Sequence, residues 1–173
     1  MIGSNDAMAS FNSKSGERYK RNNNLLEIPT FQSYKKLLLE LLDKLRSVDK
    51  VFLCTLPPIG ENKDSQVNHH VNKFNGFITK TAQERDLSIL PVSESFWSDL
   101  ALREFPFINE YNPNSIPLMR RIYGGVIHHY IFKQSWDKIA RSKGQWLLFD
   151  QIHLGERAAS IVFNLVKKEI SKD

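Results

Sequence analysis

VFLCTLPPIG, residues 51–60, carries the clearest strand signal in this sequence. The stretch starts as a short, continuous apolar run and is ended by Pro57, Pro58 and Gly60. An apolar run of this length between chain-breaking residues is typical of a strand buried on both faces of a parallel sheet. We therefore expect a central β-strand that stops at Pro57.

Downstream of this run, a helical pattern is followed by a second strand pattern. Asp64 can cap a helix, and the run 87–92 within LSILPVS reads as another buried strand. A helix between two apolar strands is the signature of a βαβ unit with parallel strands. The apolar positions of the predicted helix are Val67, Val71, Phe74 and Ile78.

Upstream, the sequence predicts a loop and then an amphipathic helix. Residues 8–29 are rich in Ser, Asn, Lys and Arg and read as a solvated loop. Thr30 can cap the helix that follows, with Asp43, Lys44 and Arg46 on its wet side. Its apolar residues are Phe31, Tyr34, Leu37, Leu38, Leu41, Leu42 and Leu45.

Towards the C-terminus the pattern predicts more helix and one more extended run. Residues 116–144 read as two helical pieces around Gly124 and Gly125, the second ended by Lys143 and Gly144. QWLLFD, residues 145–150, reads as an extended apolar run, and a last amphipathic helix carries apolar residues through Ile170.

Composition indicates one domain over residues 1–173, because 41% hydrophobic residues suffice for a sizeable core. The net charge of +5 is spread along the chain, so we expect no nucleic-acid partner. Cys54 is the one cysteine and no Asn-x-Ser/Thr sequon occurs, which favours a reducing compartment such as the cytoplasm. No apolar run has the length of a membrane span.

Two polar constellations are candidates for chemistry. IGSND, residues 2–6, reads as the end of a strand and a tight turn, where the Asn5 amide can face a developing oxyanion. Asp150 precedes His153 by three residues at a helix entrance, so its carboxylate can hold the ring and leave the other nitrogen as general base. Alternatively, the first is a plain turn, and the second is an N-cap beside a surface histidine.

Together these motifs resemble the SGNH, or GDSL-like, hydrolase family of serine esterases and acylhydrolases. Gly3, Asn5 and Asp6 match its GxND block, and Asp150 and His153 match its DxxH block. TLPPIGE and the helix bearing VNKFN are also similar to segments between those blocks. The resemblance covers Ile2 to Ile170 and implies a three-layer α/β/α fold of flavodoxin-like, doubly wound type.

The sequence departs from that family at the nucleophile. The resemblance implies a Ser in a GDS block and an oxyanion-hole Gly, both before GxND, and nothing in this chain matches either. We therefore expect a domain that lacks its first strands, with Met1 as an internal methionine or the start of a truncated gene model. None of Ser4, Ser10, Ser13, Ser15, Ser93 and Ser95 lies in a nucleophile-elbow sequence.

The resemblance implies hydrolysis of a small ester of a lipid, a carbohydrate or another acyl compound. His153 would move the proton, Asp150 would hold His153, and Asn5 would stabilise the oxyanion, with Gly3 and Asp6 shaping the turn. No metal or organic cofactor is expected. The alternative is a non-catalytic fragment or pseudoenzyme that acts as a binding scaffold and associates through exposed sheet edges.

Other candidates have a structural interpretation beside the functional one. His69 and His70 lie on one predicted helix. A solvated or interface pair is a simpler interpretation of them than a metal site. The stretch 128–130, with Arg120 and Arg121 before it, reads either as a lid or as a helix packed at the sheet edge. The three tryptophans, Trp97, Trp136 and Trp146, read as packing residues.

Overall fold

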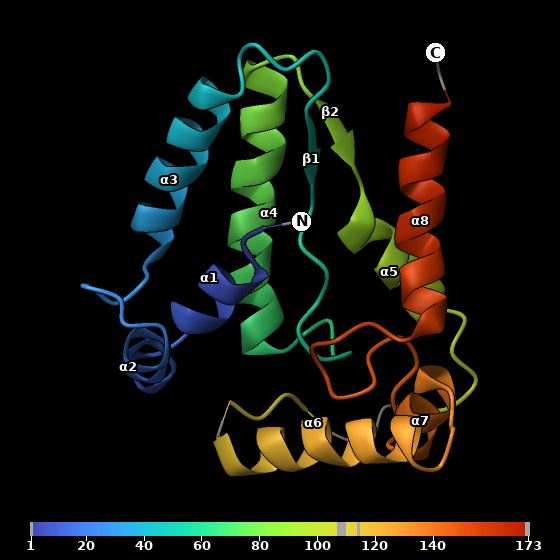
Figure 1. Cartoon of the computed structure of the whole chain (residues 1–173). Coiled ribbons are helices and arrows are strands. Elements are labelled where there is room, and N and C mark those ends of the chain that lie inside the picture. The colour runs from blue at the N-terminus through green and yellow to red at the C-terminus, as the bar shows by residue number, and fades with distance from the viewer. Residues whose placement is uncertain (1, 107–109, 114, 172–173) are drawn as a thin grey trace. The chain divides into compact units, whose positions relative to one another are not determined.

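The computed structural model describes residues 2–106, 110–113 and 115–171, and the chain forms two compact units. Unit 1 comprises Met1–Leu56 and His69–Leu90, and unit 2 comprises Pro57–Asn68 and Pro91–Asp173. The helices and strands of the chain are drawn in Figure 1. Among the described residues, no helix is both long and apolar enough to cross a membrane.

Unit 1 holds the parallel strand pair. Its elements are α1 (Ser4–Ala9), α2 (Ser13–Asn22), α3 (Phe31–Lys44), β1 (Phe52–Cys54), most of α4 (Gln66–Glu84) and β2 (Ser88–Leu90). Leu53 lies opposite Ile89 in the parallel register of β1 and β2. The predicted parallel strands and the helix between them are therefore present, but each strand has only three residues and only Leu53 and Leu90 in them are buried, so the predicted burial on both faces is wrong.

Helix α3 packs on α4 through aromatic rings. The rings of Phe31 and Tyr34 each lie 4.8 Å from the ring of Phe74, which is fully buried. Thr30 and Ser33 form the capping box that starts α3, so the predicted cap is confirmed. Helix α4 is capped differently from the prediction, because the Ser65 hydroxyl, not Asp64, accepts the Asn68 N–H.

Unit 2 is built from helices and loops. It contains α5 (Val92–Leu100), α6 (Ser115–Tyr130), α7 (Trp136–Ser142) and α8 (Glu156–Ile170). Ile139, Ala140 and Phe149 form a buried cluster in this unit, with Trp136 packed against it.

The predicted α/β/α fold is wrong. The structure has 58% helix and 5% strand, and in its described part the only sheet is the β1–β2 pair. Residues 145–150 form no sheet strand, because their N–H groups bond elsewhere: the Glu61 carboxylate accepts those of Trp146, Leu147 and Leu148. Because Glu61 accepts these N–H groups, the run forms only an isolated antiparallel bridge, between Leu148 and Leu154, among the described residues.

Two local predictions are also wrong. Residues 8–29 hold helix α2 instead of a continuous loop, since the Asn12 side chain accepts the Ser15 N–H and caps that helix. Helix α6 runs without a break through Gly124 and Gly125. A Cβ at Gly125 would lie 2.9 Å from the Phe149 ring, so this glycine serves close packing.

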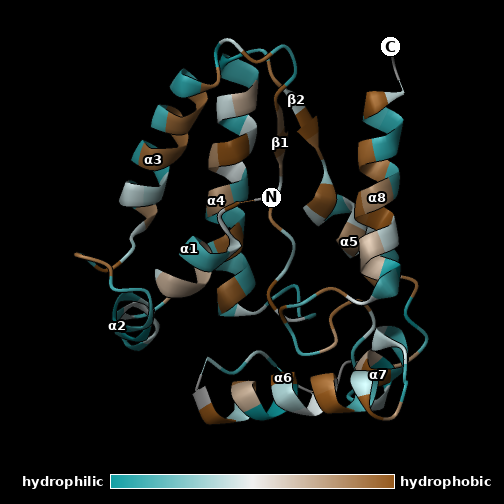
Figure 2. Ribbon diagram, in the orientation of Figure 1, coloured by the Kyte–Doolittle hydropathy of each residue, from teal (hydrophilic) through white to brown (hydrophobic). Residues whose placement is uncertain are grey.

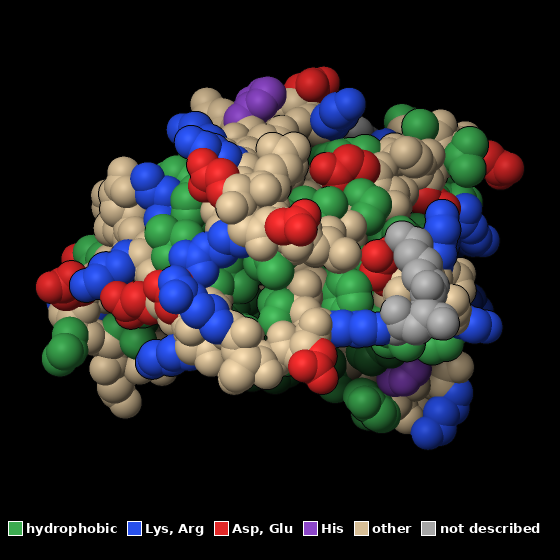
Figure 3. All heavy atoms as spheres, turned by 90° about the horizontal axis from the view of Figure 1, so that it is seen from above, with side chains coloured by type: hydrophobic (Ala, Val, Ile, Leu, Met, Phe, Trp, Pro, Cys, Tyr) green, Lys and Arg blue, Asp and Glu red, His purple; other side chains and the backbone are tan. Residues whose placement is uncertain are grey.

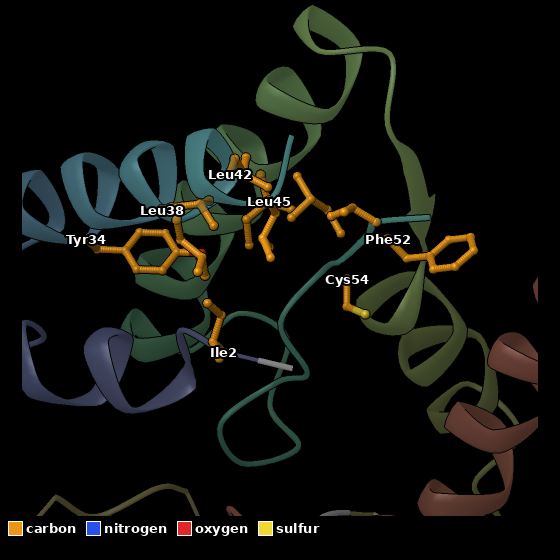
Figure 4. A pocket seen from close by; sticks show the side chains of 11 residues that line it. Ile2, Tyr34, Leu38, Leu42, Leu45, Phe52 and Cys54 are labelled. Atoms are coloured by element: carbon orange, nitrogen blue, oxygen red, sulfur yellow. The ribbon is translucent and has the colours of Figure 1, made fainter. Parts of the chain in front are cut away.

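The side of β1 away from its partner strand faces apolar side chains. Figure 4 shows Leu38, Leu42 and Leu45 close together on one side of β1, with the Phe52 ring pointing away from them. They line a pocket of about 140 Å³ within unit 1. Among the described residues no third strand occupies this place.

Candidate active site

Asp150 and His153 form a hydrogen-bonded pair in the loop before α8. Asp150 Oδ2 lies 2.6 Å from His153 Nδ1. Asp150 Oδ1 accepts the backbone N–H groups of Ile152 and His153, at 3.0 and 2.8 Å. The Asp150 side chain is fully buried, whereas 55% of the His153 side chain is exposed. The pair therefore combines a fixed carboxylate with a ring that solutes can reach.

The pair shifts the proton affinities of both groups. The hydrogen bond that His153 donates to Asp150 raises the pKa of His153 above its ordinary value, although burial acts in the opposite direction. Burial alone would raise the pKa of Asp150, but its hydrogen bonds from His153 and Ile152 lower that pKa overall. With Nδ1–H donated to Asp150, the Nε2 lone pair of neutral His153 points away from the carboxylate and can accept a proton.

Glu61 anchors the loop that carries the pair. Its carboxylate accepts the N–H groups of Trp146, Leu147 and Leu148 at 2.6 to 2.9 Å and lies 3.1 Å from Arg103 Nη1. Burial raises the pKa of Glu61, while these N–H groups and Arg103 act to lower it. No local pattern indicates this role, because Glu61 lies 85 or more residues before the three residues whose N–H groups it accepts.

Gln151 shapes the turn between Asp150 and His153. Its backbone has a φ of 82°, in the left-handed region that side chains other than glycine rarely adopt. The Gly60 N–H donates to the Gln151 carbonyl at 2.7 Å, and the Gln151 side chain donates to the Glu110 carbonyl at 2.8 Å. These bonds hold the strained residue in place, which is the pattern expected of a functional turn.

Aromatic rings form one wall beside His153. The Phe149 ring stacks on the His153 ring at 5.7 Å, Trp136 lies 4.2 Å from Phe149, and His129 stacks on Trp136 at 4.0 Å. Trp136 therefore packs, as expected, and so does the buried Trp146, whose Nε1 donates to Asp99. The 128–130 stretch ends α6, and its proposed role as a lid stays a prediction.

The GxND-like residues lie in unit 1. Gly3 has a φ of 114° and precedes α1, and no strand leads into it among the described residues. Asn5 is exposed and hydrogen bonds to Tyr19, while burial raises the pKa of Asp6. A pocket of about 780 Å³ lies here, lined by all of residues 2–6. The structure thus groups Gly3, Asn5 and Asp6 in one unit and Asp150 and His153 in the other.

One serine of unit 1 contacts a histidine that the sequence did not connect to it. Ser10 Oγ lies 3.0 Å from His70 Nε2, and the same hydroxyl donates to the Asp6 carbonyl at 2.6 Å. Because its proton is already used in that bond, Ser10 is not presented to His70 as a nucleophile. Burial lowers the pKa of His70, which favours its neutral imidazole.

Comparison of the chain with protein-family models, with curated proteins and with solved structures found no match. In the part of the chain that the structure describes, no cluster of three or more His, Cys, Asp or Glu side chains could hold a metal ion. The chemistry that this site can support therefore follows from the Asp150–His153 pair and its surroundings.

Proposed function

We propose that this chain supplies the general base of an SGNH-type ester hydrolase: His153 is the base and acid of acyl transfer, and no Ser of this sequence is the nucleophile. The single observation that carries this proposal is the 2.6 Å bond between Asp150 Oδ2 and His153 Nδ1 on an exposed ring. A buried carboxylate that fixes one ring nitrogen and raises the pKa of the imidazole is the arrangement that general-base catalysis needs.

In the proposed reaction His153 Nε2 takes the proton of an attacking hydroxyl as the hydroxyl oxygen adds to the ester carbonyl. Asp150 holds the ring and stabilises the imidazolium that forms. His153 then returns the proton to the leaving alcohol, and water repeats the cycle on the acyl group. The family resemblance gives the attacking hydroxyl to a Ser of a GDS block, and we assign it to no Ser of this sequence.

We propose that the Asn5 side-chain amide donates a hydrogen bond to the oxyanion, and that the pocket beside Asn5 binds an apolar acyl group. Its apolar lining includes Leu25, Leu26, Ile28 and Leu37, and its volume lies within the range of small-molecule sites. To serve a substrate, the Asn5 side chain would exchange its bond to Tyr19 for one to the oxyanion.

The second candidate, a binding scaffold without catalysis, is favoured by one observation. The apolar pocket beside β1 borders the strand on the side where the described chain supplies no partner strand. Such an edge pairs readily with another chain. A protein that binds a partner chain but does not catalyse ester hydrolysis would favour this candidate over the esterase.

The test supplies the missing hydroxyl from solution. Methanol is added to the protein with p-nitrophenyl acetate, and transfer of the acetyl group to methanol releases p-nitrophenol. We expect a methanol-dependent rate that falls by a factor of about 10 or more in His153→Ala, since a positioned base contributes about 100-fold or more.

His69→Ala is the matched control, because His69 is an exposed histidine of α4. We expect it to keep the rate of the unchanged protein. Equal rates in the His153 and His69 variants would refute the role of His153 as a base for acyl transfer.

A further inference from the structure

Helix α6 exposes its apolar stripe. The side chains of Ile116, Tyr123, Ile127 and Tyr130 are all exposed, as is that of Met119. At about 100° per residue these positions fall on one side of the helix. Ile131 and Phe132, directly after the helix, are exposed as well. Figure 2 shows the hydrophobic residues recurring along α6.

The opposite side of α6 faces its own unit. Gly125, two residues after Tyr123, packs against the Phe149 ring, and Lys143 Nζ donates to the Arg121 carbonyl at 3.1 Å. An amphipathic helix of a globular domain usually turns its apolar stripe towards the core. Here the small Gly125 faces inward and the bulky apolar side chains face outward.

The charges around this stripe have one sign. From Tyr111 to Trp136 the sequence contains no Asp or Glu, whereas it contains the exposed Arg120 and Lys133; Arg121 lies on the inward side of α6, and its Nη1 is buried. On the face that Figure 3 shows, in contrast, Lys and Arg side chains lie among Asp and Glu side chains. An exposed apolar stripe with flanking cations and aromatic rings has the composition of a helix that lies in the membrane interface.

We infer that α6 and residues 131–133, together the α6 surface, dock on the surface of an anionic lipid bilayer. The cations would meet lipid phosphates and carboxylates, while Tyr123, Tyr130 and Phe132 would enter the headgroup region. A partner helix fits less well, because the stripe covers about two heptads and a coiled coil needs three or four. The flanks also lack the acidic residues that would pair with the cations of a second copy.

Docking in this way would bring the candidate site to a lipid surface. Trp136 and Phe149 connect the end of α6 to the His153 ring through ring contacts within unit 2. Resting on the proposed function, this points to esters of membrane lipids as the substrate class. The binding itself does not require His153 to act as a base.

The test is sedimentation with vesicles of phosphatidylcholine alone and of phosphatidylcholine mixed with phosphatidylserine. We expect binding to the mixed vesicles that weakens with added salt. Phe132→Ser should weaken the binding to the mixed vesicles, whereas Phe163→Ser should not. The two side chains are equally exposed, Phe132 at 62% and Phe163 at 64%, but Phe163 lies on α8. Arg120→Gln and Lys133→Gln should each reduce the affinity about fivefold.

Circular dichroism of each variant checks that its helices are intact, and His153→Ala should bind vesicles as the unchanged protein does. Equal loss of binding in the Phe132 and Phe163 variants, or no binding to the mixed vesicles, would overturn the inference. So would a dimer in light scattering that Phe132→Ser dissociates, because the α6 surface would then be covered by a second copy.

Discussion

At the scale of single residues, the distinctive feature is that the buried Asp150 carboxylate raises the pKa of the exposed His153 ring. The pair also makes folding stability depend on pH. The His153 pKa is raised in the folded protein, so its contribution is complete below about pH 6.5 and is lost as the pH rises through the folded pKa. The Asp150 pKa is lowered, so its contribution is complete above about pH 4 and is lost as the pH falls.

A comparison of the unchanged protein with His153→Gln tests this dependence. The difference in their free energies of unfolding, measured with urea, should be largest near about pH 5.5 and smaller at about pH 8.5. His69→Gln, the matched control, should show a small difference at both values. A difference for His153→Gln that stays constant with pH would contradict the raised pKa.

The Glu61 side chain accepts backbone N–H groups that a neighbouring strand would otherwise accept. Glu61→Gln would place an NH₂ group among N–H donors and remove the carboxylate charge that lies 3.1 Å from Arg103. We expect the free energy of unfolding to fall by about 2–4 kcal/mol in urea denaturation. Glu17→Gln, at an exposed position, should change it by less than about 0.5 kcal/mol. Similar values for both variants would mean that Glu61 does not anchor the loop.

At the scale of elements, α6 contains a matched pair of adjacent glycines. A Cβ at Gly124 meets nothing within 4 Å, whereas one at Gly125 would meet the Phe149 ring at 2.9 Å. Gly124→Ala should therefore stabilise the protein by about 0.5–1 kcal/mol through helix propensity, and Gly125→Ala should destabilise it. Thermal unfolding measures both, and a lower melting temperature for Gly124→Ala would contradict this description of α6.

The elements also show what the sequence could predict. Helix α3 and the strands β1 and β2 were predictable, because periodicity, the Thr30 cap and the prolines are local signals. Contact between Asp150 and His153 was predictable for the same reason, since they are three residues apart. The irregular conformation of residues 145–150 was not predictable, because a carboxylate more than 80 residues away accepts the N–H groups of Trp146 and Leu147.

At the scale of the whole molecule, the candidate chemistry is divided between two compact units, with Asn5 in unit 1 and His153 in unit 2. Ser10 is the serine seen to contact a histidine, but its hydroxyl donates to a backbone carbonyl.

We therefore expect that a fluorophosphonate probe, which reacts with activated serines, will not label this chain. Mass spectrometry of the treated protein would detect the adduct, and a serine hydrolase treated in parallel shows that the probe is active. Labelling of any Ser that disappears in His153→Ala would show that the chain carries its own nucleophile.

The proposed chemistry depends most on the hydrogen bond between Asp150 and His153, and a pH titration of the histidine rings by NMR tests this bond most directly. We predict that His153 titrates above the ordinary value of about 6.5 and that Asp150→Asn lowers its pKa. The neutral ring should carry its proton on Nδ1. A His153 pKa at or below the ordinary value that is unchanged in Asp150→Asn would contradict the account.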